Sequence, residues 1–409
     1  MQSNDDNLDP ATIPLVEHAR STSAGSYLYS YPNIGAALQA RVQRQPGAEF
    51  ITFRDTDGSR RSLNFADLDQ AALRVAQKLL VDLELQPGCR IATLTGNSLD
   101  TVILYFGAWL SGITVVPINV TEDDDRIAFV LENAGISVAF APEDQAGRCN
   151  DTRVLLPSEM LAESPLENLP SVGLNSEALI VYTSGTTGAP KGVVLEHQNL
   201  IADAQGITRW HAFEPLGVAP SERAMCVLPI HHVNGIVVTL ITPLLSGGSV
   251  VLNRKFSASK FWQILTEEKC TWCSVVPTIL AFLCECKPEN WHAPPDFRHF
   301  ICGAGPLTTD LAHRFHTHFG LKVVHGYGLS ETTCYSCFLP IELSEDDYAR
   351  WMWGEGFPSI GVPLPGKRNG DSLGLWRGAR AGRAGRDSRT WRERDARLLS
   401  PPGCQRRYV

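Results

Sequence analysis

The sequence has little that would tie it to a membrane or to the secretory route. Its first ten residues, MQSNDDNLDP, are polar and acidic, so no signal peptide is expected. One long uncharged run, residues 101–121, is long enough to cross a bilayer. Ser111 and Gly112 interrupt this run, and β-branched residues dominate its second half, which favours a buried helix, turn and strand. With eleven cysteines and no secretory signal, we expect reduced thiols and a cytoplasmic protein.

The sequence also has fewer positively charged than negatively charged residues. Lysine and arginine number 36 against 44 aspartates and glutamates, so we expect no nucleic-acid partner. Two Cys-x-x-Cys pairs, at 270–273 and 334–337, have a spacing typical of a zinc site. Neither pair has the turn glycines of a zinc knuckle. Cys273 also lies in a strand-like run, so the spacing favours a buried apolar role for it over metal binding.

The sequence is rich, by contrast, in alternating strand and helix patterns. Residues 50–65 predict a β-hairpin that turns at Asp57 and Gly58, and an amphipathic helix comes after it. Strands are expected at 90–94, 113–118, 136–141, 223–228, 249–252, 271–276, 298–302 and 322–324, and helices at 99–110, 124–133, 235–245, 257–268, 277–286 and 307–318. Such an alternation predicts an α/β protein whose parallel sheets are covered by helices, and two such sheets are plausible.

Residues 182–192, YTSGTTGAPKG, combine flexibility, hydroxyl groups and one positive charge between two apolar runs. Glycines let backbone N–H groups converge on an anion, and a helix N-terminus beside them adds a positive dipole. The hydroxyl side chains at 183–187 and the ammonium of Lys191 then favour polyphosphate over a plain solvated turn. The P-loop of nucleotide triphosphatases has another spacing, because a proline stands five residues after Gly185.

This stretch resembles the phosphate-loop signature of the adenylate-forming superfamily, which contains acyl-CoA synthetases, peptide-synthetase adenylation domains and luciferases. Three further stretches resemble motifs of that family, in the family's order: LPIHHVNG at 228–235, GAGPL at 303–307 and GYGLSETT at 326–333. The resemblance covers about residue 30 to residue 366. It implies the large N-terminal domain of these enzymes, with helix-covered, parallel-rich sheets and a smaller β subdomain.

The resemblance implies an enzyme that activates a carboxylic acid. ATP and the acid would give an acyl-adenylate and pyrophosphate, and a thiol of coenzyme A or of a carrier protein would then displace AMP. The leaving group is highly charged, so the chemistry needs electrostatic neutralisation more than a protein nucleophile. LPIHHVNG resembles free-standing acyl-CoA ligases, and the apolar stretch 233–245 leans towards an aliphatic or aryl acid.

The resemblance also implies roles for single residues. Lys191, His232 and Glu331 are the catalytic candidates, and Glu331 and Thr183 are the expected ligands of Mg²⁺. Ser330 stands where the family usually has threonine, and His231 replaces a usual aromatic residue. The acyl pocket is expected at His232, Val233, Asn234 and Gly235. ATP is expected to be held by Thr183, Ser184, Gly185, Thr186, Thr187, Gly188, Lys191, Gly303, Ala304, Gly305, Pro306, Gly326, Tyr327, Gly328, Ser330 and Glu331, with Tyr327 stacked on the adenine.

The resemblance ends at residue 366. Residues 368–409 hold eleven arginines, four acidic residues and no lysine, and show no sustained helix or strand period. The family's TGD motif and the lysine of its C-terminal lid are not found, so we expect an absent lid and impaired catalysis. The expected division is an N-terminal extension (1–29), an AMP-binding domain (30–366) and an irregular tail (367–409).

Two interpretations of the arginine-rich tail are open. Its composition favours a shifted reading frame of GC-rich DNA. The alternative is a basic arm for RNA, acidic lipid or another partner, attached to a non-catalytic nucleotide- or acyl-binding protein.

Overall fold

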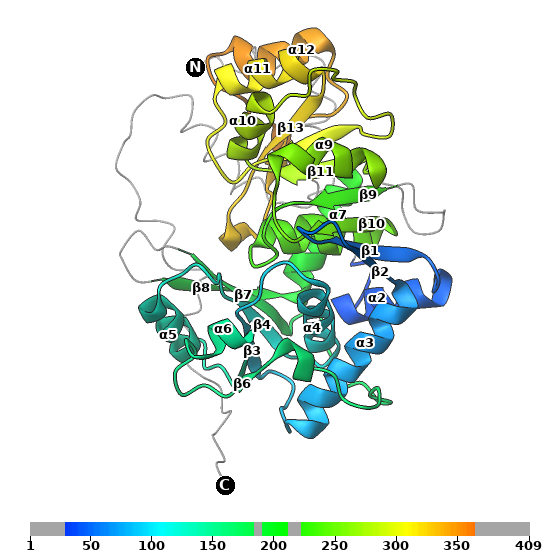
Figure 1. Cartoon of the computed structure of the whole chain (residues 1–409), viewed down its shortest axis with the longest axis vertical. Helices are drawn as coiled ribbons and strands as arrows, with labels where there is room; N and C mark the ends of the chain where they lie inside the picture. The colour runs from blue at the N-terminus through cyan, green and yellow to red at the C-terminus, as the bar shows by residue number, and fades with distance from the viewer. Residues whose placement is uncertain (1–28, 184–189, 212–221, 365–409) are drawn as a thin grey trace, which may run out of the picture.

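Two β-sheets form the framework of the protein in the computed structural model, which describes residues 29–183, 190–211 and 222–364. Every strand within those ranges belongs to one sheet or the other. In Figure 1 the two sheets lie one above the other along the long axis of the molecule. Both sheets are crossed over by helices, which confirms the α/β fold expected from the sequence. The tail and the N-terminal 28 residues lie outside the described ranges.

The lower sheet in Figure 1 has six strands. In spatial order they are β6 (Val154–Leu155), β5 (Val138–Phe140), β3 (Arg90–Thr93), β4 (Thr114–Pro117), β7 (Glu177–Thr183) and β8 (Lys191–Glu196). All neighbours are parallel except β7 and β8, which form an antiparallel hairpin. Parallel neighbours need crossovers, and α4 (Leu99–Leu110) and α5 (Asp124–Asn133) supply them.

The upper sheet has nine strands. In spatial order they are β15 (Val362–Pro363), β14 (Cys337–Phe338), β13 (Lys322–Tyr327), β12 (His299–Cys302), β11 (Trp272–Val275), β9 (Arg223–Cys226), β10 (Ser249–Asn253), β1 (Glu49–Arg54) and β2 (Arg60–Asn64). The six central strands are parallel, and antiparallel strands lie only at the two edges. The antiparallel strands β14, β15 and β2 thus extend the parallel centre of the sheet at its two edges.

The crossover helices of the upper sheet are α9 (Ala258–Glu267), α10 (Pro277–Glu285) and α11 (Thr309–Phe319). The other helical elements are α2 (Ile34–Arg44), α3 (Phe65–Gln77), η1 (Lys78–Asp82), α6 (Glu143–Ala146), η2 (Pro157–Glu159), α7 (His197–Trp210), η3 (Asn234–Ile241), α8 (Thr242–Ser246), η4 (Ser330–Thr332), α12 (Glu345–Ala349) and η5 (Arg350–Gly354). Of these, η2 and η4 are 3₁₀-helices and η1, η3 and η5 are π-helices.

The long uncharged run of the sequence becomes a core helix, a turn and a core strand, as predicted. All residues of α4 are buried except Asp100, so this helix is apolar on every side because protein surrounds it. Ser111 caps the helix and Gly112 turns the chain at a φ of +68°. In the parts of the chain that the structure describes, no helix has the length and apolar character needed to cross a membrane.

Most of the expected elements are confirmed, and one helix differs in kind. The hairpin of β1 and β2 turns at Gly58, whose φ is +91°. The helix expected at 235–245 is instead a π-helix, η3, continued by α8. The hydroxyls of Thr239 and Thr242 donate to the carbonyls of Gly235 and Val237 within this segment. The apolar period of a short buried run is similar in an α-helix and in a π-helix. The sequence therefore predicts a helix here but does not distinguish between the two kinds.

The cysteine pairs take up the apolar role that the sequence favours. Cys270 and Cys273 are fully buried, and burial raises the pKa of the Cys273 thiol well above its usual range. Eight cysteines of the described ranges are free thiols: Cys149, Cys226, Cys270, Cys273, Cys284, Cys286, Cys302 and Cys337. Those ranges contain no group of three or more His, Cys, Asp or Glu side chains placed to hold a metal ion.

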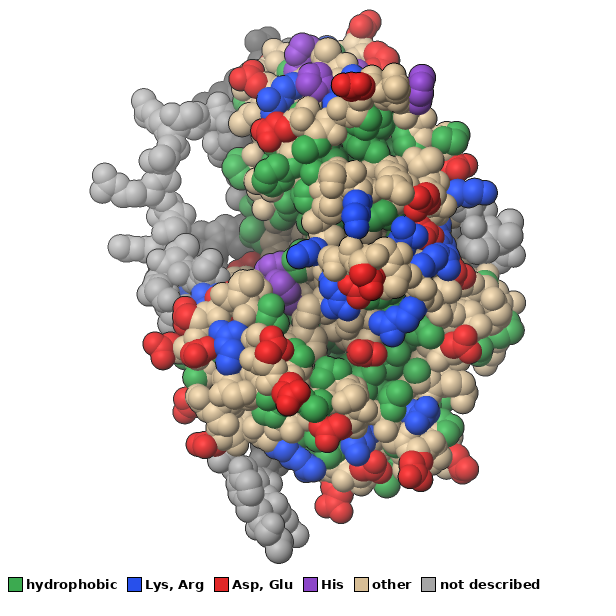
Figure 2. All heavy atoms as spheres, in the orientation of Figure 1, with side chains coloured by type: hydrophobic (Ala, Val, Ile, Leu, Met, Phe, Trp, Pro, Cys, Tyr) green, Lys and Arg blue, Asp and Glu red, His purple; other side chains and the backbone are tan. Residues whose placement is uncertain are grey.

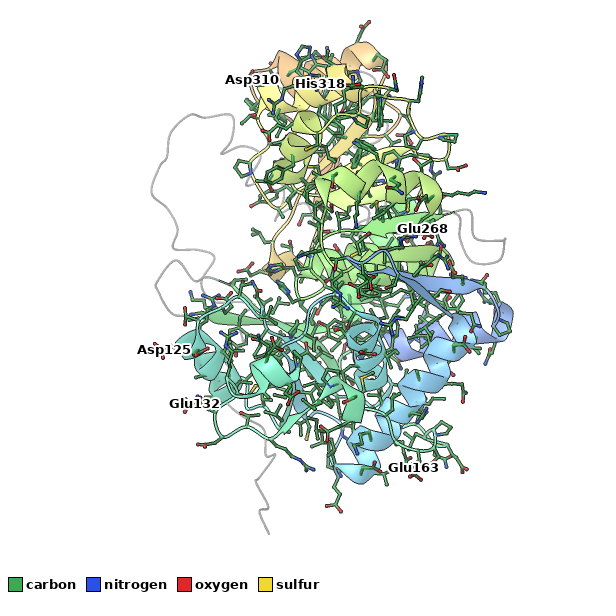
Figure 3. The ribbon with its side chains drawn as sticks, viewed as in Figure 1. Asp125, Glu132, Glu163, Glu268, Asp310 and His318 are labelled. Carbon is green, nitrogen blue, oxygen red and sulfur yellow. The ribbon has the colours of Figure 1, made fainter. Side chains whose placement is uncertain are left out.

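Charged side chains are spread over the face of the molecule shown in Figure 2, where both signs are interspersed. Histidines gather at the top of this view, over α11 and α12. Figure 3 shows Asp125 and Glu132 on α5 pointing outward from the lower part of the molecule. Figure 3 also places Glu268 on the upper part, where it accepts hydrogen bonds from Arg54 and Arg60. These charges therefore stay solvated or paired, and the interior of each sheet remains apolar.

One carboxyl group departs from this pattern. Asp69 of α3 is only 7% exposed, and its Oδ1 atom has no hydrogen-bond partner among the described residues. Burial raises the pKa of this carboxyl to about 6. The pKa of Asp69 in the folded protein lies above its usual value of about 4. The free energy of unfolding therefore falls as the pH rises from about 4 to about 6.

We therefore expect Asp69→Asn to stabilise the protein at neutral and higher pH. The free energy of unfolding should rise by about 2 kcal/mol near pH 8 and change little near pH 4, where Asp69 is already protonated. Urea unfolding at the two pH values measures this. Asp67→Asn is the control, since Asp67 is exposed on the same helix and should give no such pH-dependent gain. An equal effect of Asp69→Asn at both pH values would contradict the assignment.

Candidate active site

Three of the four sequence motifs leave the same edge of the upper sheet. Residues 228–235 follow β9, residues 303–307 follow β12, and residues 326–333 begin at the end of β13. These strands are parallel through β11, so their carboxyl ends point to one edge. Ligands of open α/β sheets bind beyond that edge, because side chains and free N–H groups of the loops after the strands converge there.

The fourth motif lies on the lower sheet, in the hairpin of β7 and β8. Thr183 ends β7 and pairs directly with Lys191, the first residue of β8. The strand β7 is parallel to β4, so its end also lies at a carboxyl edge. The Lys191 side chain is exposed. Ser184, Gly185, Thr186, Thr187 and Gly188 lie outside the described residues.

The expectation of a helix dipole beside this loop was wrong. The loop leads into the strand β8, and the next helix, α7, begins only at His197. The chain therefore places no helix N-terminus directly after the glycines. Positive charge at this motif comes from Lys191, and backbone N–H groups can add to it without a helix.

Asn97 joins the carboxyl edges of the two sheets. It follows β3 of the lower sheet and is only 4% exposed. Its Nδ2 donates to the carbonyls of Leu228 (3.0 Å) and Asn253 (2.9 Å) in the upper part of the fold. Its Oδ1 accepts from the backbone N–H of Ile230 at 2.9 Å. The segment 228–235 is thus fixed from the opposite sheet by a residue that belongs to none of the four motifs.

The segment 228–235 presents two neighbouring histidines and then enters the core. The rings of His231 and His232 lie 4.3 Å apart between centroids. His232 is exposed, whereas the Nε2 atom of His231 is buried without a hydrogen-bond partner among the described residues. Burial, with His232 nearby, lowers the pKa of His231 to about 3. Although part of the His232 side chain is exposed, the loss of water around its ring also lowers its pKa. Both rings are therefore neutral near pH 7.

The acyl-pocket residues that come next are less accessible than expected. Val233 is half-buried, and Asn234 and Gly235 are buried at the start of η3. The Asn234 side chain is hydrogen-bonded on both sides, to Ser274 and to Tyr335. A methyl group on Gly235 would lie 2.3 Å from the carbonyl oxygen of Pro229, so only glycine fits there.

The turn 303–307 exposes backbone where adenine is expected. Gly303 is buried, whereas Ala304, Gly305 and Pro306 are exposed. Ala304 has a φ of +60°, a left-handed conformation that costs a non-glycine residue about 1 kcal/mol or more. Such strain persists only where the surrounding structure imposes it, and it often marks a binding site.

The segment 326–333 carries the residues expected around the nucleotide. Gly326 is buried, and Tyr327, Gly328 and Ser330 are half-buried. Burial raises the pKa of Tyr327, so its hydroxyl stays protonated. Glu331 is exposed on the 3₁₀-helix η4. An exposed carboxylate here and the half-buried hydroxyl of Thr183 are the hard oxygen donors that Mg²⁺ prefers, so the two residue types fit that ion.

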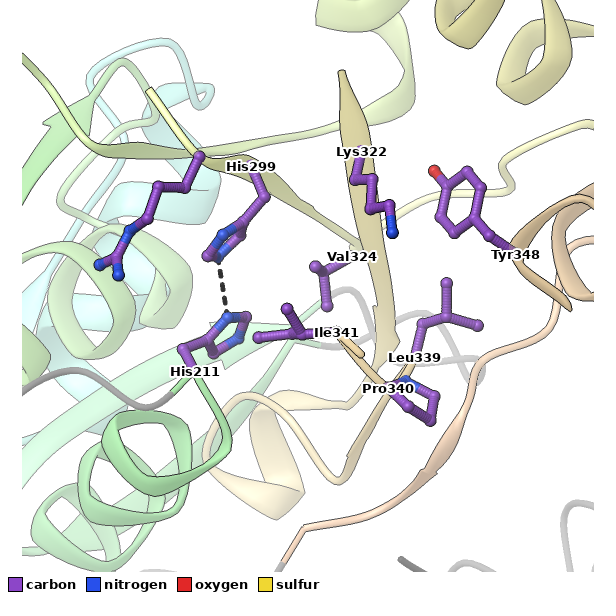
Figure 4. Close-up of a pocket in the computed structure, with 9 residues that line it drawn as sticks. His211, His299, Lys322, Val324, Leu339, Pro340, Ile341 and Tyr348 are labelled. Carbon is purple, nitrogen blue, oxygen red and sulfur yellow. Dashed lines mark hydrogen bonds between the residues drawn. The ribbon is translucent and has the colours of Figure 1, made fainter. Parts of the chain in front are cut away.

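A small pocket of about 130 Å³ lies away from these motifs (Figure 4). Its walls include the first residues of β12 and β13, His299 and Lys322, so it opens at the amino edge of the upper sheet. His211 and His299 share a hydrogen bond of 2.9 Å between Nδ1 and Nε2. Because none of the four motifs contributes to this pocket, it is separate from the expected nucleotide site.

Comparison with known proteins agrees with this arrangement. The family model "AMP-binding enzyme" matches residues 38–369. The chain is 30% identical over 379 residues to the sulfoacetate–CoA ligase of Cupriavidus necator, a match that covers 88% of this chain and 67% of that protein. It is 30% identical over 315 residues to the long-chain fatty-acid–CoA ligase FadD13 of Mycobacterium tuberculosis, covering 73% of this chain and 60% of that protein.

Solved structures give the same result. The Bacillus subtilis O-succinylbenzoate coenzyme A synthetase, solved with ATP and magnesium ion, matches with a TM-score of 0.69 and 26% identity, covering 81% of this chain and 65% of that chain. The N-terminal domain of FACL13 from Mycobacterium tuberculosis also has a TM-score of 0.69 and 26% identity, and the match covers 81% of this chain and 82% of that domain.

We expect Asn97→Ala to destabilise the protein by about 2–4 kcal/mol, because it removes three buried hydrogen bonds to backbone groups. Urea unfolding measures the loss. Asn97→Asp is the matched comparison: it keeps the acceptor for Ile230 and removes the two donated bonds. A change below about 0.5 kcal/mol for Asn97→Ala would show that the bridge between the sheets contributes little.

The histidine pair of the pocket predicts loss of stability in mild acid. Burial lowers the pKa of His299 to about 3, and burial, His299 and Arg298 lower that of His211 well below its usual value. Below about pH 6.5 these histidines bind protons in the unfolded chain but not in the folded one. The free energy of unfolding therefore falls by about 1.4 kcal/mol per pH unit for each group.

Replacing one ring of the pair should weaken this pH dependence. Between about pH 7 and pH 5, the free energy of unfolding of His299→Gln should fall less steeply than that of the unchanged protein. The exposed His292→Gln is the control and should leave the slope unchanged. Equal slopes for His299→Gln and the unchanged protein would rule out a neutral buried pair.

Proposed function

The chain belongs to the AMP-binding enzyme family, and from this we propose that it activates a carboxylic acid with ATP and transfers the acyl group to the thiol of coenzyme A. The observation that supports this most is the position of the motifs at the carboxyl ends of strands. Three motif segments leave one carboxyl edge of the upper sheet, and Asn97 ties that edge to the lower sheet, which carries Thr183 and Lys191. A carrier-protein thiol is the other acceptor that the family resemblance allows.

Both proposed steps are displacements at a charged centre. A carboxylate oxygen attacks the α-phosphorus of ATP, the bond to the bridging oxygen breaks, and pyrophosphate leaves with the electron pair. The thiolate sulfur then attacks the acyl carbon, and AMP leaves. Neither step needs a protein nucleophile, so the residues of this site act by holding charge and position.

In this proposal Lys191 neutralises the β- and γ-phosphates, together with the hydroxyls and N–H groups of the loop before it. The turn 303–306 and Tyr327 flank the adenine, and Ser330 donates a hydrogen bond near the α-phosphate. Glu331 and Thr183 would hold Mg²⁺, which supplies neutralisation of the phosphate oxygens when bound. Because the side chains of Lys191 and Glu331 are both exposed, neither charge has to be moved out of the core before ATP binds.

His232 is proposed to lie at the acyl end, beside the reacting carboxylate. Its lowered pKa leaves the ring neutral, so it can donate or accept one hydrogen bond without repelling the cations around the phosphates. His231 stays behind it as a buried neutral ring. Two neutral rings can hydrogen-bond the acid, and the lowered pKa of each ring weakens it as a base.

We propose that the protein acts in the cytoplasm. The four motifs precede residue 334, so nucleotide binding is expected to depend on residues before that position.

The proposal is tested by ATP binding and by pyrophosphate exchange with a panel of carboxylic acids. We expect calorimetry to show Mg²⁺-dependent ATP binding, weakened about tenfold or more by Glu331→Gln or Lys191→Met, since each removes one charge at the phosphates. Exchange should depend on the acid that is added. ATP binding without exchange for any acid would favour the non-catalytic nucleotide-binding alternative.

Matched controls separate local effects from changes in net charge. Glu342→Gln and Lys255→Met remove exposed charges that no motif contains, and both should leave ATP affinity unchanged. Failure of the unchanged protein to bind ATP or AMP would contradict the proposed site outright.

A further inference from the structure

The pocket of about 130 Å³ at the amino edge of the upper sheet has a polar end and an apolar end (Figure 4). His299 and Lys322 begin the neighbouring parallel strands β12 and β13 and are paired in register. Their side chains therefore leave the same face of the sheet, about 5 Å apart at the backbone, and form the polar end. Val324 lies two residues further along β13 and points to the same face. With Leu339 and Ile341 it forms the apolar end.

The ammonium group of Lys322 is held in place at the polar end. It donates to the carbonyl of Leu343 at 2.9 Å and lies 5.7 Å from the centre of the Tyr348 ring. It also pairs with Glu345 at 3.3 Å, but the Glu345 side chain is 66% exposed, so water screens this pair. An ammonium group has three N–H donors, and these two oxygen partners use at most two of them. Lys322 can therefore donate to a ligand in the pocket.

Arg298 adds positive charge beside the histidine pair of the pocket. Its guanidinium pairs with the buried carboxylate of Glu222. Burial lowers the pKa of His211 and of His299, and the charge of Arg298 lowers both further. The two rings are therefore neutral near pH 7, and they stack with 4.9 Å between centroids. Since the charge that acts on both rings is positive, the polar end favours an anion over a cation.

From this geometry we propose that the pocket is a binding site for a short-chain organic carboxylate. The carboxylate would lie beside Lys322 and His299, and the alkyl chain would lie over Val324. A cavity of roughly 150 Å³ can hold a benzene ring, so the volume of about 130 Å³ suits an acid of about six non-hydrogen atoms, such as butyrate.

This site is distinct from the one proposed for the acid that is activated. The four residues of β12 lie between the pocket and the turn 303–307, a distance of roughly 13 Å along the strand. The pocket therefore gives the protein a second place for an acid, at the opposite edge of the same sheet.

Urea unfolding of the full chain with butyrate tests the proposal. A ligand of about six non-hydrogen atoms commonly binds with a Kd of about 1 mM. Compared with sodium chloride, sodium butyrate at about 20 mM should then lower the equilibrium constant of unfolding about twentyfold. Butyramide, which has the same size and no charge, should lower it less than about twofold. Absence of a butyrate effect would overturn the site, and equal effects of the two compounds would overturn the preference for a carboxylate.

Two substitutions locate the butyrate effect, which is measured for each variant against its own unfolding without butyrate. Ile341→Phe fills the apolar end and should reduce the effect to less than about twofold. Lys322→Met removes the ammonium group and should weaken binding about tenfold, which leaves about a threefold effect. Lys255→Met, at an exposed lysine that does not line the pocket, is the matched control and should keep the full effect. Should Ile341→Phe not fold, a full effect in Lys322→Met overturns the proposal.

His232→Ala separates this pocket from the proposed acyl site. His232 is exposed and follows β9 at the carboxyl edge, so its loss should leave the butyrate effect at about twentyfold. Loss of the effect in His232→Ala but not in Ile341→Phe would assign butyrate to the acyl site and overturn the inference. The measurement uses neither ATP nor turnover, so its failure would leave the proposed ligase function standing.

Discussion

The hydrogen bonds of Asn97 are the constraint on which the candidate site depends. A site that combines groups from two sheets works only if the two carboxyl edges keep a fixed distance and angle. Asn97 makes that connection with one side chain, since its amide binds Leu228, Ile230 and Asn253 while its backbone continues from β3. The hydroxyl of Tyr105 on α4 adds a second connection to the carbonyl of Ile230 at 3.1 Å. Both connections are buried, so water does not compete for them.

The groups of the site divide into an exposed set and a buried set. Lys191, His232 and Glu331, which are the residues proposed to meet the substrates, are all exposed. The residues behind the acyl segment, Asn234 and Tyr335, are buried and already hydrogen-bonded to each other. The exposed set can respond to a ligand at little cost, whereas any change in the buried set disturbs close packing. In the proposed site, the exposed residues would therefore recognise charge and the buried residues would set the shape.

Much of the fold is predictable from the sequence, because apolar periodicity and turn residues determine the type of each element. The helices at 99–110 and 124–133 agree with α4 and α5 at both ends. The residues that connect distant segments are not predictable in the same way. Asn97 stands in an ordinary polar loop, and its partners in β10 and after β9 are more than a hundred residues away. The apolar run after the phosphate loop forms the strand β8, so the helix dipole expected beside the loop is not supplied by the residues that follow it.

The two histidines show how the surroundings decide the chemistry open to a motif residue. In sequence, only the motif context sets His232 apart from His231 as a candidate for the acyl pocket. In the structure, burial holds the pKa of His231 at about 3 and lowers that of His232, so neither ring carries charge near pH 7. Lys191 and Glu331 then remain the charged motif residues within the described ranges, one for phosphate and one for a metal ion. If the proposed function holds, these two charges meet the phosphates and the metal ion, and the neutral histidines contribute only position and hydrogen bonds to binding of the acid.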